Sequence, residues 1–450
     1  MTKLRLAIVG AGPAGIYAAD ILLKAERRFE VSIDLFEQLP APYGLVRYGV
    51  APDHPRIKGI INALRDVLDT GRIRLFGNVR YGRDITLDDL KKHYNAVIFS
   101  TGAVRDAALD IPGIDLPGSY GAADFVSWYD GHPDFPREWP LEHRAVAVIG
   151  NGNVALDVAR TLAKHAEDLL VTEIPGNVYE GLAKSDVTDV HVFGRRGPAQ
   201  VKFTPLELRE LGEMRDVDMI VHDEDFELDP AAVAAIETNK QIFVLNKVLN
   251  SWRTRERTGA SRRLHLHFWA KPLEVLGAEA VSGFRYERTR PDGVGGVIGT
   301  GEIREIPVQG VYRAVGYFGS PLDELPFDDH RGVIPNREGQ VIDDNDELVH
   351  GVYATGWIKR GPVGLIGHTK SDAMETIKHV INDQANWWSP AEPDEESVVE
   401  MLRSRDIRFT DLSGWHRLDQ HEIALGEAEG RARIKVVPRE DMVTVSRPEA

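Results

Sequence analysis

The feature that most constrains the fold is a pair of glycine-rich turns, each placed between an apolar strand-length run and an apolar helical run. The first turn, Gly10-Ala11-Gly12-Pro13-Ala14-Gly15, follows Leu4–Val9, and the second, Gly150-Asn151-Gly152-Asn153-Val154-Ala155, follows Ala145–Ile149. In such turns the first glycine permits a tight bend, the second lets the backbone approach a pyrophosphate, and the third lets helix and strand pack closely. The N-terminus of the following helix stabilises the phosphate charge. We therefore expect two Rossmann-like dinucleotide-binding domains in an α/β chain.

The ends of the next strands indicate which dinucleotide each domain takes. Val31–Phe36 runs into Glu37, 27 residues beyond Gly10, where a carboxylate can bind an adenosine ribose. Val190–Phe193 instead runs into Gly194-Arg195-Arg196. Paired guanidinium groups match the 2′-phosphate of NADP(H), whereas a carboxylate would repel it. The second domain is therefore expected to bind NADP(H) rather than NAD; the alternative is that the two arginines only solvate a loop.

The order of the segments predicts that the second domain is inserted in the first. Asn95–Ala103 and Gly310–Gly316 have the shape of crossovers, and Ser371–Asn386 has the pattern of a helix that returns to the first domain. We expect an FAD-binding domain at residues 1–105 and 331–388 and an NADP-binding domain at 106–330. Residues 389–450 start Pro- and acid-rich and continue polar, which predicts a C-terminal appendage. Such a pair of domains is expected where one domain keeps a bound flavin and the other binds a nucleotide that exchanges.

Composition excludes several classes of protein. The 70 acidic and 54 basic side chains leave a net charge of −16, which argues against nucleic acid as a partner. There is no cysteine, so a redox dithiol, a Cys-ligated cluster and a thiolate zinc site are excluded, and no metal site is expected. Redox chemistry must come from a bound cofactor. The longest apolar stretches are strand-length and Met1 leads directly into Leu4–Val9, so we expect no stable membrane insertion and a cytoplasmic location.

Five longer motifs stand in order between about residues 4 and 385. They are Pro42–Pro55, Gly150–Arg160, Gly194–Pro198, Glu207–Leu211 and Gly356–Pro362. Together they resemble the adrenodoxin-reductase-like ferredoxin–NADP(+) reductases, and the longest are specific rather than generic nucleotide loops. The resemblance implies FAD and NADP(H) as cofactors. It also implies hydride transfer between NADPH and FAD, coupled to one-electron transfer with a ferredoxin-type iron–sulfur protein.

The same resemblance implies roles for individual residues. His54 and Glu210 match a family pair beside the flavin and nicotinamide, where they assist proton movement and orientation. The residues that would contact FAD are Ala14, Glu37, Leu45, Val79, Trp357, Gly364, Leu365 and Ile366. Those that would contact NADP(H) are Asn151, Gly152, Asn153, Val154, Arg195, Arg196, Glu207 and Gly364.

Without the family, the residues leave plainer interpretations open. A single histidine in a Pro-rich loop, as His54 is, is more often a hydrogen-bonded structural residue than an acid or base. Glu207 and Glu210 are one turn apart, so they either face one cleft or form a solvated helix face. Whether Asp157 is buried cannot be read from its position. A basic island around Trp252 could steer an acidic ferredoxin or be a solvated loop; it comprises Arg253, Arg255, Arg257, Arg262 and Arg263.

Two other functions are compatible with these residues. One is an NADPH:quinone or diaphorase-type flavin reductase with a small acceptor. The other is a flavin-bearing structural or redox-sensing protein that binds NADP(H) without useful turnover. Both keep the two nucleotide sites and differ only in where the electrons go.

Overall fold

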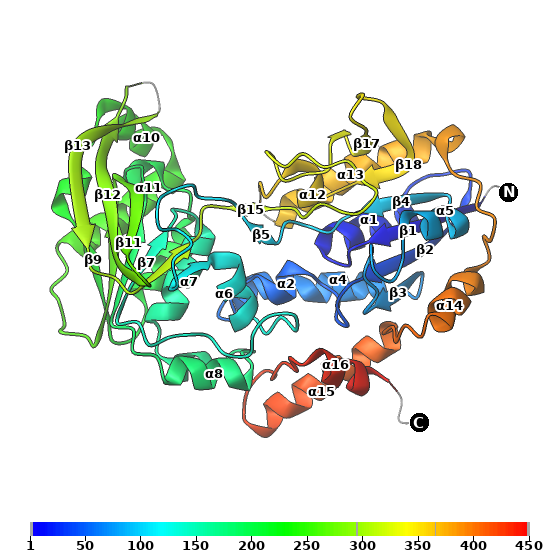
Figure 1. Cartoon of the computed structure of the whole chain (residues 1–450), viewed down its shortest axis with the longest axis horizontal. Coiled ribbons are helices and arrows are strands. Elements are labelled where there is room, and N and C mark those ends of the chain that lie inside the picture. Colours follow the sequence, from blue (N-terminus) through cyan, green and yellow to red (C-terminus); the bar gives the residue numbers. More distant parts are fainter. Residues whose placement is uncertain (1–2, 294–295, 365, 448–450) are drawn as a thin grey trace.

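The computed structural model describes residues 3–293, 296–364 and 366–447 of the chain. It has two α/β domains, with the middle of the chain in one and both ends of the chain in the other (Figure 1). The fold class expected from the two glycine turns is confirmed, with the second domain inserted in the first. No helix in the described part of the chain is long and apolar enough to cross a membrane.

The first domain is built on a seven-stranded sheet of order β16-β17-β18-β4-β1-β2-β3. Strand β1 lies between β2 and β4 and is parallel to both, while β17 is antiparallel to its neighbours β16 and β18. The strands are β1 (Lys3–Val9), β2 (Glu30–Glu37), β3 (Ile73–Gly77), β4 (Ala96–Phe99), β16 (Asn336–Arg337), β17 (Gln340–Ile342) and β18 (Leu348–Ala354).

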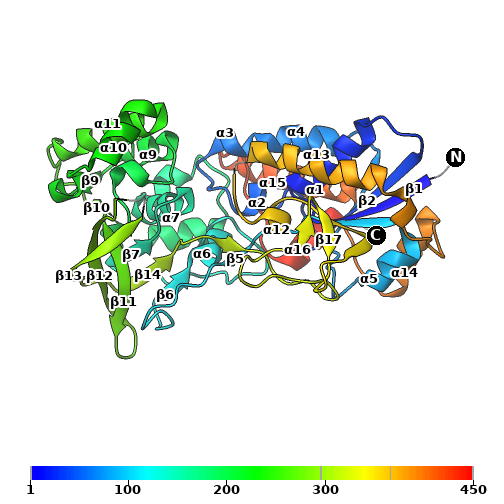
Figure 2. The same ribbon diagram turned by 90° about the horizontal axis from the view of Figure 1, so that it is seen from above.

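Both faces of this sheet are covered, which explains why β1 is an unbroken apolar run. Leu4, Leu6 and Ile8 point into one core, and Ala7 and Val9 into the other. Helix α1 packs on the first side against α4 and α13 (Figure 2). The helices are α1 (Pro13–Lys24), α2 (Leu45–Tyr48), α3 (Pro55–Lys58), α4 (Ile60–Leu68), α5 (Leu87–His93), α12 (Trp357–Arg360) and α13 (Ile366–Asn382), with a 3-10 turn, η4 (Gln384–Asn386).

The second domain has a six-stranded parallel sheet of order β6-β14-β7-β8-β10-β9. The strands are β6 (Ser119–Gly121), β7 (Ala145–Ile149), β8 (Asp189–Phe193), β9 (Val217–Val221), β10 (Arg262–His267) and β14 (Gly310–Arg313). The helices are α6 (Ala122–Tyr129), α7 (Asn153–Ala163), α8 (Gly176–Ala183), α9 (Pro205–Gly212), α10 (Pro230–Thr238) and α11 (Lys240–Arg253). Short 3-10 turns are η1 (Ala166–Leu169), η2 (Pro198–Gln200) and η3 (Asp223–Phe226).

An antiparallel sheet that the sequence analysis did not anticipate covers the other face of this domain. It consists of β11 (Ala270–Gly277), β12 (Val281–Pro291) and β13 (Val297–Ile306). Phe284 and Tyr286 of β12 pack on Ile149 and Phe193 of the parallel sheet. The parallel sheet is therefore sandwiched between helices and a second sheet.

The chain crosses between the domains through two short strands, β5 (Arg105–Asp106) and β15 (Tyr317–Phe318), which pair with each other. They lie in the middle of Figure 1, between the two domains. The expected crossovers at 95–103 and 310–316 are thus shifted: β4 and β14 belong to the two sheets, and the crossings follow them in the chain.

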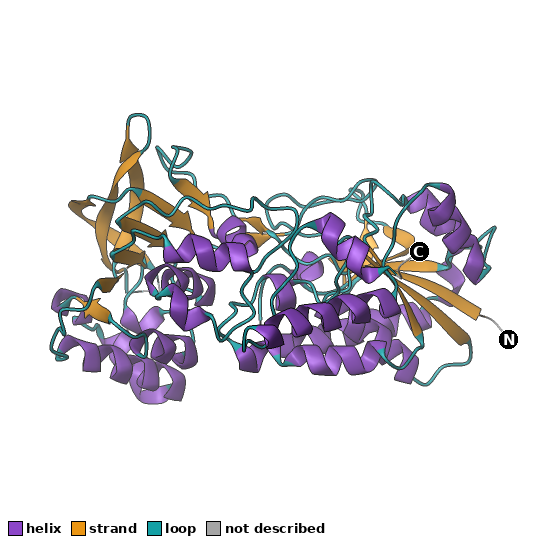
Figure 3. Ribbon diagram, turned by 90° about the horizontal axis from the view of Figure 1, so that it is seen from below, coloured by secondary structure: helices purple, strands orange, loops and turns teal. Residues whose placement is uncertain are grey.

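The C-terminal segment is not an appendage, which corrects the expectation for residues 389–450. It forms α14 (Glu395–Ser404), α15 (Leu412–Ala428) and α16 (Arg439–Ser446). Leu402 is fully buried in one core of the first domain, and Trp415 and Met442 are buried in the other. Figure 3 shows the first domain's strands fanning out behind the helices that cover them, as expected of a twisted sheet. Residues 389–450 are mostly polar, so the sequence did not reveal the narrow apolar stripes with which these helices help to cover the first domain's sheet.

Candidate functional site

The first glycine turn has the geometry that its sequence predicted. Gly10 has φ 110°, and a Cβ at Gly15 would lie 2.1 Å from the Gly10 carbonyl oxygen. At Gly12, which precedes Pro13 and α1, a Cβ would meet only the Gly44 Cα, at 3.9 Å. No side chain caps the N-terminus of α1. The backbone N–H groups there suit the oxygens of a pyrophosphate.

Glu37 lies at the end of β2 beside this turn and is 6% exposed. One carboxylate oxygen accepts a hydrogen bond of 2.9 Å from the Ala11 N–H, and the other accepts one of 3.1 Å from the Leu39 N–H. Burial raises the pKa of Glu37, although these N–H groups favour the ionised form. Buried Val79 donates its N–H to the Glu37 carbonyl. The two predicted FAD residues are thus neighbours.

Other predicted FAD residues approach the same turn from distant parts of the chain. Half-buried Leu45 begins α2 next to Gly44, and half-buried Trp357 begins α12. A Cβ at Gly356 would lie 2.6 Å from the Ala14 Cβ, so the chain before Trp357 packs directly on α1. Gly364 is exposed at φ 86°. Leu365 and the side chain of Ile366 lie outside the described residues.

The second glycine turn begins α7 in the same way. A Cβ at Gly150 would lie 2.2 Å from the Ala314 carbonyl oxygen, whereas nothing lies within 4 Å of one at Gly152. The side chain of Asn153 and the carbonyl of Asn151 accept hydrogen bonds from the chain before α9, at 3.0 Å and 2.9 Å. Val154 and Trp357 both pack against one small cluster, formed by Ala103, Ala123 and Tyr317. A predicted NADP(H) residue and a predicted flavin residue therefore approach the same cluster between the domains.

Arg195 and Arg196 follow β8, with Arg195 exposed and Arg196 half-buried. Their backbone is fixed, because the Arg195 carbonyl accepts a hydrogen bond from the Thr289 hydroxyl and the Arg196 carbonyl accepts one from the Trp269 N–H. Across the described ranges neither guanidinium forms a hydrogen bond or an ion pair with the protein. Both remain available for a phosphate.

His54 lies between the two domains and is 3% exposed. Its Nε2 lies 2.8 Å from Asp157 Oδ1 on α7, and its Nδ1 lies 3.0 Å from Glu210 Oε2 on α9. The Nη2 of Arg160 is 2.8 Å from the same Nε2. Burial lowers the pKa of His54, but the hydrogen bond and charge of Asp157, helped by Glu210, outweigh it and place the pKa above 6.5. The ring is therefore held from both nitrogens.

Arg160 ties this histidine to the loop that carries it. Its guanidinium, 1% exposed, donates two hydrogen bonds of 2.8 Å to Asp53 and lies 2.9 Å from Asp157. Arg160, with Lys164 3.0 Å away, lowers the pKa of Asp53 well below its usual range in spite of burial. The sequence analysis assigned no role to Arg160; its spacing of one turn from Asp157 on α7 was the available signal.

Glu207 and Glu210 turn out to face the interdomain region and not a solvated helix surface. Glu207 is 4% exposed, and among the described residues nothing hydrogen-bonds its Oε2. Burial raises the pKa of both carboxyl groups. A buried carboxylate oxygen without a hydrogen-bond partner, next to the second glycine turn, is suited to accept a hydrogen bond from a hydroxyl or amide of a bound molecule.

Known proteins match this chain along its whole length. It is 40% identical to NADPH-ferredoxin reductase FprA of Mycobacterium tuberculosis, over 99% of each chain. The chain belongs to the NADPH–ferredoxin reductase family. It is also 37% identical to the human mitochondrial NADPH:adrenodoxin oxidoreductase, over 98% of this chain and 91% of that protein. The structure of M. tuberculosis FprA in complex with NADPH superimposes with a TM-score of 0.90, at 38% identity and 99% coverage of each chain.

Membership of the NADPH–ferredoxin reductase family confirms the resemblance inferred from the five motifs. A family model described as pyridine nucleotide-disulphide oxidoreductase matches residues 4–192, which include both glycine turns. FAD and NADP(H), the expected cofactors, agree with this membership. The residues at both turns fit dinucleotides. No side chain caps either helix N-terminus, and the space beside Gly12 and Gly152 is open.

Proposed function

We propose that this protein transfers electrons between NADPH and a ferredoxin-type iron–sulfur protein through an FAD held in the first domain. The observation that carries the proposal is that Trp357 and Val154 pack against the same small cluster, which lies between two uncapped glycine turns. A nicotinamide and a flavin bound at such turns would be brought together there. Close similarity to NADPH-ferredoxin reductase FprA supports the same reaction.

In this proposal the first domain holds FAD and the second holds NADP(H). Glu37 would bind the adenosine ribose of FAD, and the start of α1 would bind the pyrophosphate. Arg195 and Arg196 would bind the 2′-phosphate, since their guanidinium groups are unpaired by protein within the described residues. FAD, when bound, supplies a site that accepts a hydride and gives up electrons singly. The protein supplies position, charge and exclusion of water.

His54 would hold a proton rather than form a bond to substrate. With Asp157 on one ring nitrogen and Glu210 on the other, its orientation is fixed and its charged form is favoured. Glu207 would orient the nicotinamide end of NADP(H) from the adjoining turn of α9. We assign His54 and Glu210 as positioning residues that hold a proton near the interdomain site.

The basic island gives only limited support for the docking site of a ferredoxin. Trp252 is buried in the second domain's core and cannot contact a partner. Arg253 pairs with Asp223 and Arg263 with Asp189, while Arg262 donates to a backbone carbonyl. Arg255 also donates to a backbone carbonyl, that of Gly212 at 3.4 Å, so exposed Arg257 remains as the candidate for a partner contact. Encounter with an acidic ferredoxin would then depend on ionic strength.

The test is anaerobic stopped-flow reduction of the purified yellow protein by NADPH and by NADH, followed by mixing with a low-potential ferredoxin. We expect rapid flavin bleaching with NADPH, and reoxidation by ferredoxin that slows in salt. Bleaching with no electron transfer to any ferredoxin, but rapid transfer to quinone, would favour the diaphorase alternative. Absence of bleaching would contradict the enzyme assignment and favour a sensor.

The cytoplasmic location remains a prediction from the sequence. The human relative is named as mitochondrial. Fractionation of source cells, with the activity assayed in each fraction, tests the prediction; activity concentrated in an organelle would contradict it.

A further inference from the structure

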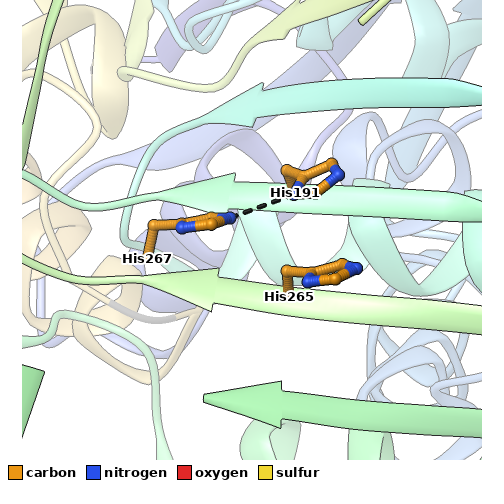
Figure 4. Close-up of side chains that lie close together, drawn as sticks. All are labelled: His191, His265 and His267. Carbon is orange, nitrogen blue, oxygen red and sulfur yellow. Dashed lines mark hydrogen bonds between the residues drawn. The ribbon is translucent and has the colours of Figure 1, made fainter. Parts of the chain in front are cut away.

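Three histidines gather on one face of the parallel sheet of the second domain. His191 lies on β8 and pairs in register with His265 on β10, and His267 follows two residues later on the same face. Figure 4 shows the three rings over neighbouring strands, with a dashed line for the hydrogen bond between His191 and His267. One ring nitrogen from each lies within 4.8 Å of those of the other two. The sequence analysis expected no metal site, and these residues have no sequential metal motif.

We propose that His191, His265 and His267 bind one divalent transition-metal ion of the class that prefers imidazole, with Zn²⁺ as its representative. Zinc–imidazole bonds of about 2.0–2.1 Å place tetrahedral ligand nitrogens about 3.3 Å apart. His191 Nδ1 and His267 Nε2 are already 3.0 Å apart. The rings of His191 and His265 stack nearly parallel, with 4.2 Å between centroids and 18° between planes, so at least one ring must turn well out of the stack before both in-plane lone pairs point at one ion.

The surroundings keep these rings ready as ligands. Asp189 Oδ1 lies 3.2 Å from His265 Nε2, which orients that ring and leaves Nδ1 for the metal. Arg263 forms an ion pair with Asp189 and so partly neutralises the negative charge of that carboxylate.

A fourth histidine extends the cluster. His222 follows β9, and its ring stacks on His267 with 4.7 Å between centroids. Its Nε2 is buried and accepts or donates no hydrogen bond among the described residues. This ring nitrogen has no partner in the described part of the chain, but His222 is not among the three residues whose ligand atoms lie within 4.8 Å of one another, so the proposed site has three protein ligands.

A purely structural role is the competing explanation. Phe193 stacks on His267 at 4.6 Å with 6° between the planes, so the rings could serve only as part of an aromatic ladder. Such a ladder predicts no metal affinity. It also leaves unexplained why several ring nitrogens, rather than apolar rings, occupy a face that is half-buried.

Calorimetric titration of the full-length holoprotein with ZnCl₂, after removal of any purification tag, tests the proposal. We expect one equivalent to bind, and the double variant His191→Gln/His265→Gln to bind at least about tenfold more weakly. Exposed His330 provides the matched control, and His330→Gln should bind as the wild type does. No saturable binding by the wild type, or equal loss in the control, overturns the proposal.

A second measurement covers the case in which the double variant does not fold. Wild-type crystals soaked in ZnCl₂ should give an anomalous difference peak at the zinc edge between β8 and β10. A peak only at other histidines, or none, overturns the site. Neither measurement depends on electron transfer, so failure of this site and failure of the proposed reductase function are distinguishable.

Discussion

Asp157 and Glu210 hold His54 from opposite ring nitrogens, although the three residues come from different parts of the chain. The positions of Glu37, Arg195 and Arg196 at strand ends could be predicted from local pattern, while their roles in binding FAD and NADP(H) stay predictions. The partners of His54 could not be predicted from local pattern, since the contact forms only when two domains meet. At the scale of residues, therefore, local pattern places residues at strand ends but does not identify contacts between domains.

Replacement of His54 by glutamine should alter stability in a pH-dependent way. The pKa of folded His54 lies above 6.5, so its stabilising contribution is complete below pH 6.5 and is lost as pH rises through the folded pKa. The difference in urea midpoint between wild type and His54→Gln should be largest near about pH 6 and shrink by about pH 9. His421→Gln, at an exposed position, is the control. A difference that grows with pH would contradict this assignment.

Removal of both nucleotide-loop arginines should weaken discrimination between NADPH and NADH. A hydrogen bond to a charged group contributes about 1.5–3 kcal/mol, so Arg195→Ala/Arg196→Ala should lower kcat/KM for NADPH about 10- to 100-fold. The value for NADH should barely change, because NADH has no 2′-phosphate. Steady-state kinetics with both nucleotides measures this, with Arg403→Ala, at an exposed position on α14, as the control. Equal losses for both nucleotides would show a structural defect instead.

Strands and glycine turns were the elements that local pattern predicted best, because a strand that is buried on both faces has a continuous apolar sequence. Ala145–Ile149 is both the expected strand and the observed β7. The antiparallel sheet of β11, β12 and β13 was missed, because β13 is mostly exposed and its sequence is rich in glycine and charge. Of the C-terminal helices, α14 agrees with a helix that the sequence predicts at 397–405, whereas α15 and α16 were missed because their apolar residues are few and widely spaced.

Gly15→Ala tests the packing of α1 on β1. The added methyl group would lie 2.1 Å from the Gly10 carbonyl oxygen, so α1 must move away from the strand. We expect loss of the yellow FAD colour after purification and a fall in Tm. Gly176→Ala is the matched control, since nothing lies within 4 Å of its Cβ and it begins α8. Normal FAD content in Gly15→Ala would disprove the close-approach argument.

Buried charges connect the C-terminal segment to both domains. Arg47 of the first domain pairs with Glu422 of α15, and the two side chains are almost completely buried. Lys435 reaches Asp130 and Glu173 of the second domain, where Lys58 of the first domain also binds. In Figure 1, α15 and α16 run below the first domain toward α8. No local sequence pattern predicts such a network, because its members are far apart in the chain.

Glu422→Gln should be strongly destabilising. It leaves the buried Arg47 guanidinium without its counter-charge, and breaking a buried pair costs about 3–5 kcal/mol. Urea unfolding followed by tryptophan fluorescence measures the loss. Asp88→Asn removes an exposed ion pair with Lys91 and should change stability by less than about 0.5 kcal/mol. Similar effects of the two substitutions would contradict the assigned importance of burial.

The burial of α14, α15 and α16 in the first domain affects the order in which the chain folds during synthesis. The sheet of the second domain is complete within residues 119–313, so this domain can fold while the rest is still being made. Strands β1 and β4 leave the ribosome early, yet β4 waits for its neighbour β18, and the core beside β1 waits for Met442 of α16. We therefore expect the second domain to fold first, which reverses the usual order of N-terminal domain first. We expect FAD uptake to follow release of the finished chain.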